Sequence, residues 1–281
     1  MYMFRYKNFT AGFVLSALII GMAFTSLFYT PYAPNEMNAP AKLAPPSIKH
    51  PMGTDPYGRD IFSRVMKGSV ISIIVGIVTV LIGLVFGVAL GLLSAYNGGV
   101  IDEIIMRFCD LLFGFPAVLT AILITSVFQP SVLYAMIAIG IFYIPVFARL
   151  SRASAMSVWE REYIDAARAS GMKEYAIAMQ HVLPNISSPL LIQGTIQFAV
   201  AILAEAGLSY LGLGVQPPDP SWGRMLNEAQ TYMAIAPWMA IFPGASIGVA
   251  VLGFNLLGDG LRDALDTKQR MIKQLSGDRN D

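Results

Sequence analysis

Residues 69–95 read SVISIIVGIVTVLIGLVFGVALGLLSA and contain no charged side chain. Crossing a hydrocarbon layer of roughly 30 Å takes about 20 mostly apolar residues in a helix, so this stretch predicts a transmembrane helix. Gly83, Gly87 and Gly91 recur four residues apart and share one face of that helix. Small residues on one face let another helix approach closely, and we expect such packing here.

The composition extends this prediction to the whole chain. Of its 281 residues, 55% are hydrophobic and 13% are charged, whereas soluble domains carry about 25% charged residues. The 19 Lys and Arg residues are scattered and the net charge is +1. This argues against a nucleic-acid partner, because binding phosphates takes a concentrated basic patch. The single cysteine, Cys109, cannot form an internal disulfide.

Five further apolar runs are expected to cross the membrane as helices, because hydrocarbon offers the backbone no water and a barrel would need alternating segments. The sequence thus predicts an all-α polytopic membrane protein with about six transmembrane helices. The first run follows Arg5 and Lys7; a signal peptide is the alternative, disfavoured by its length and the lack of an A-x-A site. Pro116 and Pro145 are expected to interrupt the runs that contain them. The runs are Ala11–Tyr29, Ile104–Phe128, Val132–Leu150, Leu190–Leu213 and Pro237–Leu257.

Most Lys and Arg residues fall on one side of this six-span arrangement, and the positive-inside rule assigns that side to the cytoplasm. Both termini are then cytoplasmic. The expected layout is a cytoplasmic N-terminus at 1–10, a first transmembrane helix at 11–29, an extracytoplasmic loop at 30–68, a transmembrane core at 69–257 and a cytoplasmic tail at 258–281. Within the core, 151–187 is expected to be a cytoplasmic loop and 214–236 an extracytoplasmic loop.

The sequence offers no constellation for catalysis or metal binding. It contains neither the phosphate-binding pattern G-x-x-x-x-G-K-[ST] nor H-E-x-x-H. Residues 244–248 fit the G-x-S-x-G nucleophile pattern, but they lie in an expected helix, where the required strand-to-helix turn cannot form. We therefore predict that the chain is not an enzyme and holds no metal or cofactor. Any energy must come from a partner subunit or an ion gradient.

One helix carries a polar stripe. Gln193, Gln197, Ala201 and Glu205 recur every four residues in an otherwise apolar run. Polar groups in hydrocarbon are costly and suggest function, so Gln193, Gln197 and Glu205 are candidates for a hydrated translocation path. The alternative is that the glutamines bond a neighbouring helix and Glu205 lies near the outer interface.

The segment 151–187 has two short amphipathic patterns. Tyr163, Ala166, Ala167 and Ser170 follow the spacing of one helix face, and Met172, Tyr175, Ala176 and Met179 repeat it. We expect two helices hinged at Gly171 and stopped by Pro184. Small exposed residues would let the first helix enter a groove on another protein, with Glu162, Asp165 and Arg168 available for charge pairing. An interfacial hairpin lying on lipid is the alternative.

This segment resembles the "EAA" coupling loop of ABC importer permeases. The family pattern is E-A-A, three residues, G, nine residues and I-x-L-P; Asp165-Ala166-Ala167, Gly171 and Val182-Leu183-Pro184 follow it approximately, with Asp165 in place of Glu. Residues 50–64, 208–223 and 254–263 are similar to further signatures of the dipeptide, oligopeptide and nickel permeases of that class. The likeness covers most of the chain.

The resemblance implies a type I ABC importer permease (MetI-like) fold in a bacterial inner (plasma) membrane. It implies a paralogous second permease subunit, two ATPase subunits that bind ATP and Mg, and an extracytoplasmic solute-binding protein. Peptides are the expected substrate, with nickel or a metal chelate as the alternative; an ion-coupled secondary transporter is the alternative class. The residues that the resemblance assigns to ATPase docking are Glu162, Asp165, Ala166, Ala167, Arg168, Gly171, Met172 and Pro184.

Overall fold

The computed structural model describes residues 7–277, which fold almost entirely into helices. Asp60 begins the second helix by accepting a hydrogen bond from the Ser63 amide at 2.8 Å, which satisfies one of the free donors of the first turn. The long helices are α1 (Lys7–Phe28), α2 (Ile61–Asn97), α3 (Gly99–Gly114), α4 (Ala117–Phe128), α5 (Val132–Trp159), α8 (Leu183–Tyr210) and α10 (Trp238–Gly277). The short ones are α6 (Glu162–Ala169), α7 (Glu174–Ile177) and α9 (Trp222–Ala229), with a π-helical turn at Ala178–Val182.

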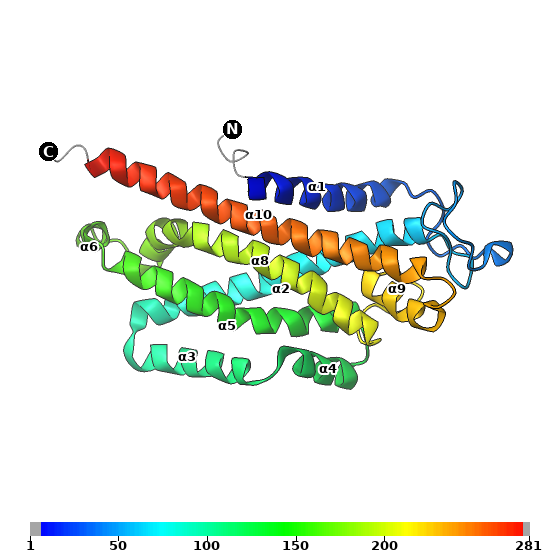
Figure 1. Ribbon diagram of the computed structural model, residues 1–281. Helices are drawn as coiled ribbons and strands as arrows, with labels where there is room; N and C mark the ends of the chain where they lie inside the picture. The colour runs from blue at the N-terminus through cyan, green and yellow to red at the C-terminus, as the bar shows by residue number, and fades with distance from the viewer. Residues whose placement is uncertain (1–6, 278–281) are drawn as a thin grey trace.

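The long helices lie side by side in one elongated bundle (Figure 1). Helix α5 packs on α2, α8 contacts both, and α1 lies along α10. The end of α10 and α6 lie at one end, which we call the hairpin end, and α1 starts on that side of the bundle but short of the end. The loop after α1 and helix α9 lie at the opposite end, which we call the loop end.

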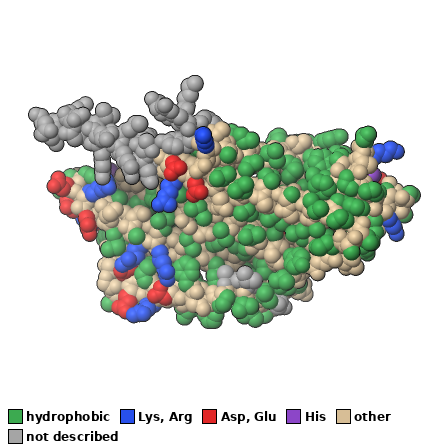
Figure 2. Space-filling view, in the orientation of Figure 1, with side chains coloured by type: hydrophobic (Ala, Val, Ile, Leu, Met, Phe, Trp, Pro, Cys, Tyr) green, Lys and Arg blue, Asp and Glu red, His purple; other side chains and the backbone are tan. Residues whose placement is uncertain are grey.

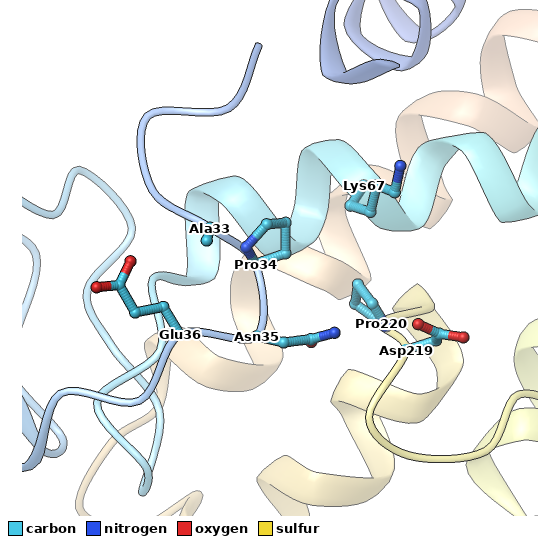
Figure 3. Close-up of a pocket in the computed structure, with 7 residues that line it drawn as sticks. All are labelled: Ala33, Pro34, Asn35, Glu36, Lys67, Asp219 and Pro220. Carbon is cyan, nitrogen blue, oxygen red and sulfur yellow. The ribbon is translucent and has the colours of Figure 1, made fainter. Parts of the chain in front are cut away.

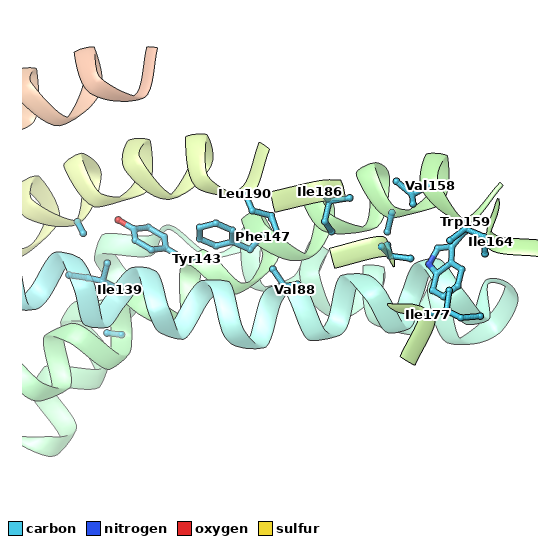
Figure 4. Close-up of a cluster of buried hydrophobic side chains, with 14 of the residues drawn as sticks. Val88, Ile139, Tyr143, Phe147, Val158, Trp159, Ile164, Ile177, Ile186 and Leu190 are labelled. Atoms are coloured by element: carbon cyan, nitrogen blue, oxygen red, sulfur yellow. The ribbon is translucent and has the colours of Figure 1, made fainter. Parts of the chain in front are cut away.

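Two apolar cores hold the bundle together. The first lies between α2, α5 and α8 and includes Phe147, Tyr143 and Leu190 (Figure 4). It continues into the hairpin end, where Ile164 and Ile177 are fully buried. The second lies between α1, α2, α8, α9 and α10 toward the loop end. Each short element at an end is therefore anchored to the spanning helices by apolar contacts.

The glycine stripe of α2 confirms the predicted close helix packing. All three glycines are buried against α5. A Cβ atom on Gly87 would lie 2.6 Å from the Ile144 carbonyl oxygen, a distance that real Cβ atoms do not adopt. The Ser151 hydroxyl on α5 lies in the same contact and bonds back to the Phe147 carbonyl at 2.7 Å. The backbones of α2 and α5 thus approach closely because these positions carry no side chain.

Five helices are long and apolar enough to cross a membrane, and α3 with α4 makes a sixth if this bent pair counts as one span. The interruption expected at Pro116 in the run Ile104–Phe128 is confirmed, because α3 and α4 are bent by 85° at a break there. Phe115, directly before Pro116, is extended (φ −95°, ψ 133°), as a residue preceding proline prefers. Pro145 was expected to interrupt its run and does not, since α5 continues through it.

Several expected boundaries also differ. Helix α2 begins at Ile61 and α1 at Lys7, so the loop expected at 30–68 spans only 29–60. Helix α5 continues to Trp159, which shortens the loop expected at 151–187. Pro184 does not stop a helix, because the chain continues through it from the π-helical turn at Ala178–Val182 into α8. The expected termini at 1–10 and 258–281 lie partly outside the described residues.

Candidate functional site

Helices α6 and α7 form a hairpin that projects at the end of α5 (Figure 1). Gly171 has φ +85°, a left-handed conformation that only glycine adopts without strain. The Met172 amide donates to the Ala167 carbonyl at 3.2 Å and the Ser170 amide to the Ala166 carbonyl at 3.0 Å, which closes the last turn of α6. The predicted break at Gly171 is confirmed, and its cause is this helix-terminating turn.

The hairpin has a buried inner face and an exposed outer face. Ile164 is 0% exposed and Ala167 is 9% exposed, and both pack in the first core. Tyr163 and Ala166 lie outside. The sequence pattern grouped Ala167 with Tyr163 and Ala166 on one face. That prediction is wrong for Ala167, which lies on the buried face instead. In the second half Met172 packs inward, whereas Tyr175 and Met179 are exposed.

Arg168 is engaged within the chain, although the sequence suggested that it was available to a partner. Its guanidinium donates to Asp165 Oδ1 and to Glu174 Oε1, each at 3.0 Å, and lies 5.4 Å from the centre of the Trp159 ring. The hydrogen bond to Glu174, followed by the pairing with Asp165, raises the pKa of Arg168. Arg168 thus joins α5, α6 and α7 and fixes the angle of the hairpin.

The remaining predicted docking residues face outward. Glu162, Ala166, Gly171 and Pro184 are exposed, and the Asp165 side chain is 71% exposed. Glu162 and Asp165 lie in the first turn of α6 and Arg168 in the last, an arrangement that complements the helix dipole. Among the side chains that the structure describes, none forms an ion pair with Glu162. The outer face therefore offers the small side chain of Ala166 beside the carboxylates of Glu162 and Asp165.

A buried ion-pair network organises the loop end, and sequence reasoning missed it. Arg59 and Arg64 both contact Glu228 Oε2 on α9, at 3.0 and 3.3 Å. Arg59 also pairs with Asp55, and Arg224 reaches Glu228 Oε1 at 3.3 Å. The sequence marked residues 55–64 only as part of a stretch that is similar to a family signature, and it gave no sign of ion pairing there. Glu228 lies far along the chain, and no sequence signal indicates that it closes this network.

Trp222 joins the same region to the spanning helices. Its side chain is fully buried, and its indole N–H donates to the Val65 carbonyl at 3.0 Å. This contact joins the stretch 208–223 to the residue that directly follows the stretch 50–64. The loops at this end are therefore ordered by specific contacts with α2 and α9.

An open pocket of about 390 Å³ lies on the surface of the loop end (Figure 3). Pro34 and Asn35 reach it from the loop after α1, Lys67 from α2, and Asp219 with Pro220 from the loop after α8. The Glu36 carboxylate points away from the other side chains. The pocket is shallow and of mixed charge, which is typical of a protein contact surface.

The polar stripe of α8 turns mostly into the bundle. Gln193 is half-buried, Gln197 is 8% exposed and Glu205 is fully buried. Glu205 Oε1 accepts a hydrogen bond from the Ser209 hydroxyl at 2.6 Å, and Ser209 Oγ accepts one from the Val215 amide at 3.0 Å. In this conformation Glu205 fastens the end of α8 to the following loop, and its place in a path stays a prediction.

The described residues hold no group of three His, Cys, Asp or Glu side chains that suits a metal ion. The serine of the G-x-S-x-G string, Ser246, lies within α10 and donates to the Phe242 carbonyl at 2.8 Å. It is thus an ordinary helix serine rather than a residue on a nucleophile turn.

The bundle has the fold of an ABC importer permease. A chain of the methionine ABC transporter, solved in inward-facing conformations, superposes with a TM-score of 0.57 at 16% identity; the match covers 71% of this chain and 95% of that one. The expected MetI-like fold is confirmed. Figure 2 shows hydrophobic side chains over the middle of the bundle and charged side chains gathered at the hairpin end. This distribution is typical of a protein whose middle lies in a membrane.

Sequence comparison places the chain in a family. Residues 83–271 match the binding-protein-dependent transport system inner membrane component family, to which this chain belongs. It is 44% identical to a dipeptide transport system permease protein of Alkalihalophilus pseudofirmus, over 92% of this chain and 84% of that one. It is 45% identical to a glutathione transport system permease protein of Pectobacterium atrosepticum, over 89% and 84% of the two chains. The family resemblance is confirmed, and the chain is a multi-pass inner-membrane permease.

Proposed function

We propose that this chain is a permease subunit of an ATP-driven peptide importer and that its α6–α7 hairpin docks a separate ATPase subunit. One observation carries the proposal. The hairpin buries Ile164 and Ala167 in the first core and leaves Ala166 and Glu162 exposed. A partner that grips the outer face therefore moves α5 and α8 with it, because the inner face is packed against them.

The orientation follows from this docking. The hairpin end is cytoplasmic, so the end of α10, which lies there, and the start of α1, which lies on the same side of the bundle (Figure 1), are cytoplasmic too. The loop end then faces outward, and the pocket of Figure 3 lies where a solute-binding protein would dock. ATP and Mg bind to the two ATPase subunits, and a paralogous permease completes the path.

Peptides are the proposed substrate. The relatives named above serve dipeptide and glutathione transport systems, which supports peptides over nickel or a metal chelate. The family description names dependence on a binding protein, which supports an importer over an ion-coupled secondary transporter. Gln193 and Gln197, with Glu205 beyond them, remain the proposed lining of the path, reached when α8 moves.

Docking is tested by affinity purification of the tagged chain in mild detergent, with the co-purified proteins identified. Ala166→Arg places a bulky cation on the outer face of α6 and is expected to remove the ATPase while the second permease stays bound. Ala153→Arg is the matched control, because Ala153 is exposed on α5 outside the hairpin. Equal ATPase recovery from both variants would contradict the proposed docking surface.

A further inference from the structure

Helix α3 has two exposed flanks of opposite character. Side chains three and four residues apart lie on the same side of a helix. The polar flank comprises Glu103, Arg107 and Asp110. The apolar flank comprises Ile101, Ile104, Phe108 and Leu111. The side chains of Glu103 and Arg107 are 66% and 76% exposed, so the chain itself leaves the polar flank uncovered.

Arg149 of α5 extends the polar flank. Its guanidinium donates to Asp110 Oδ1 at 2.6 Å and lies 4.4 Å from the centre of the Phe113 ring. The side chains of Arg149 and Asp110 are 46% and 56% exposed. A guanidinium has five N–H donors, and this bond occupies one of them. The pair can therefore accept further charged groups from outside the chain.

This ion pair lies at the depth of the uncharged part of α2. Gly87 of α2 lies against Ala148 of α5, and Gly91 lies against Ala148 and Arg152. Arg149 is therefore level with residues 87–91, which are about 6–12 Å inside the end of the uncharged run 69–95 at a rise of about 1.5 Å per residue. Charged side chains at membrane depth almost always face protein or a water-filled cavity instead of lipid.

A water-filled cavity suits the polar flank better than lipid or a protein partner does. The apolar flank of the same helix supplies the surface that acyl chains prefer. The cores of protein interfaces are depleted of charged residues, whereas the polar flank and Arg149 carry two carboxylates and two guanidinium groups. These four charges sum to zero. Such a surface matches a solute that itself carries one charge of each sign.

We propose that the polar flank lines the inner, water-filled part of the path, and that Asp110 and Arg149 bind the two ends of a peptide with free termini. This inference rests on the proposed function. The peptide carboxylate accepts hydrogen bonds from Arg149, and the peptide ammonium donates to a carboxylate oxygen of Asp110. Because site and peptide are each balanced in charge, binding adds no net charge at membrane depth.

Water access is tested in the complete importer in lipid nanodiscs with a charged, membrane-impermeant thiol reagent. Arg107→Cys lies on the polar flank and should react. Phe108→Cys lies on the apolar flank and should react about tenfold more slowly or less, because hydrocarbon excludes a charged reagent. The native Cys109 is buried. Equal rates for the two variants overturn the proposal. Reaction of Arg107→Cys in the isolated chain alone also overturns it, since a partner subunit then covers the flank.

Peptide binding is tested in the same nanodiscs without the solute-binding protein, so that the selectivity of that protein does not enter. The probe is a radiolabelled alanyl dipeptide whose second side chain carries a diazirine, and it should label residues 103–114. Asp110→Asn should lower labelling by the free dipeptide about tenfold, as suits a lost bond between charged groups, and leave labelling by its N-acetyl form unchanged. Arg149→Gln should act in the same way on the free carboxylate and not on the C-terminal amide.

The chemical forms of the probe separate binding from packing. Equal loss of labelling by the free and blocked probes would mean that Asp110 and Arg149 act only by holding α3 on α5, which overturns the proposal. Labelling that avoids 103–114 in the wild type overturns it too. ATP-driven peptide uptake by the wild-type importer with its binding protein is measured in parallel. Uptake without labelling at the polar flank rejects this site alone, whereas absence of uptake contradicts the proposed function itself.

Discussion

Single residues decide how closely the helices of this permease approach. Gly87 lets α2 lie against the α5 backbone, and Gly171 lets the hairpin turn with a left-handed backbone. Arg168 holds three elements through two ion pairs and a ring contact. These three positions act by geometry and charge rather than by chemistry on a substrate.

Replacing Gly87 should destabilise the bundle. Gly87→Ala adds a Cβ atom 2.6 Å from the Ile144 carbonyl oxygen, and overpacking of this kind costs about 1–3 kcal/mol. Gly21→Ala is the control, because nothing lies within 4 Å of a Cβ atom there. Thermal unfolding in detergent is expected to give a lower midpoint for the first variant alone, and equal midpoints would contradict the packing.

Arg168 should control the rigidity of the hairpin. Arg168→Gln removes the ion pairs to Asp165 and Glu174. The amides of 170–172 are then expected to exchange hydrogen about two- to fivefold faster, a small effect because ion pairs on the surface stabilise only weakly. Arg168→Lys keeps the charge but not the forked geometry, so it should give an intermediate rate. Hydrogen exchange followed by mass spectrometry measures these rates. Unchanged rates in both variants would show that Arg168 does not hold the hairpin rigid.

At the scale of elements, long apolar runs were enough to predict the spanning helices, because hydrocarbon permits no other backbone. The expected break was right at Pro116 and wrong at Pro145. Pro116 follows Gly114 and Phe115 at a break, whereas Pro145 lies where α5 is packed between α2 and α8. Packing against α2 and α8 keeps α5 helical through Pro145. That packing cannot be predicted from the local sequence. The inner face of α6 was misplaced for the same reason, because Ile164 and Ala167 are selected by the core they meet.

The contact between α9 and the loop before α2 depends on Glu228. Glu228→Gln leaves the buried Arg59 and Arg64 without a full counter-charge, and breaking a buried pair costs on the order of 3 kcal/mol. Glu36→Gln, at an exposed glutamate with no ion pair in the described chain, should be close to neutral. Denaturant unfolding of the purified protein compares them, and similar stabilities would mean that the network contributes little.

For the whole molecule, the ends of the bundle can be assigned to sides of the membrane. The native Cys109 is buried, so it need not be replaced before a single added cysteine is tested for reaction with a maleimide. Ser170→Cys at the hairpin should react with an impermeant maleimide only in inside-out vesicles. Ile48→Cys, at a fully exposed position of the outer loop, should react only from the outside. The reverse pattern would invert the proposed orientation.

The sequence could not predict how α8 relates to the hairpin, since Pro184 suggested a stop. The run from Glu174 to Tyr210 is instead one continuous span of 37 residues, about 55 Å long at a rise of about 1.5 Å per residue. It is a single rod from the hairpin to the buried Glu205 and Ser209. A tilt of about 5° at its inner end displaces its outer end by roughly 5 Å over that length, about the width of one side chain. On the proposed docking, a small rotation of the hairpin would thus become a larger displacement at the far surface, with only the π turn at 178–182 interrupting the rod.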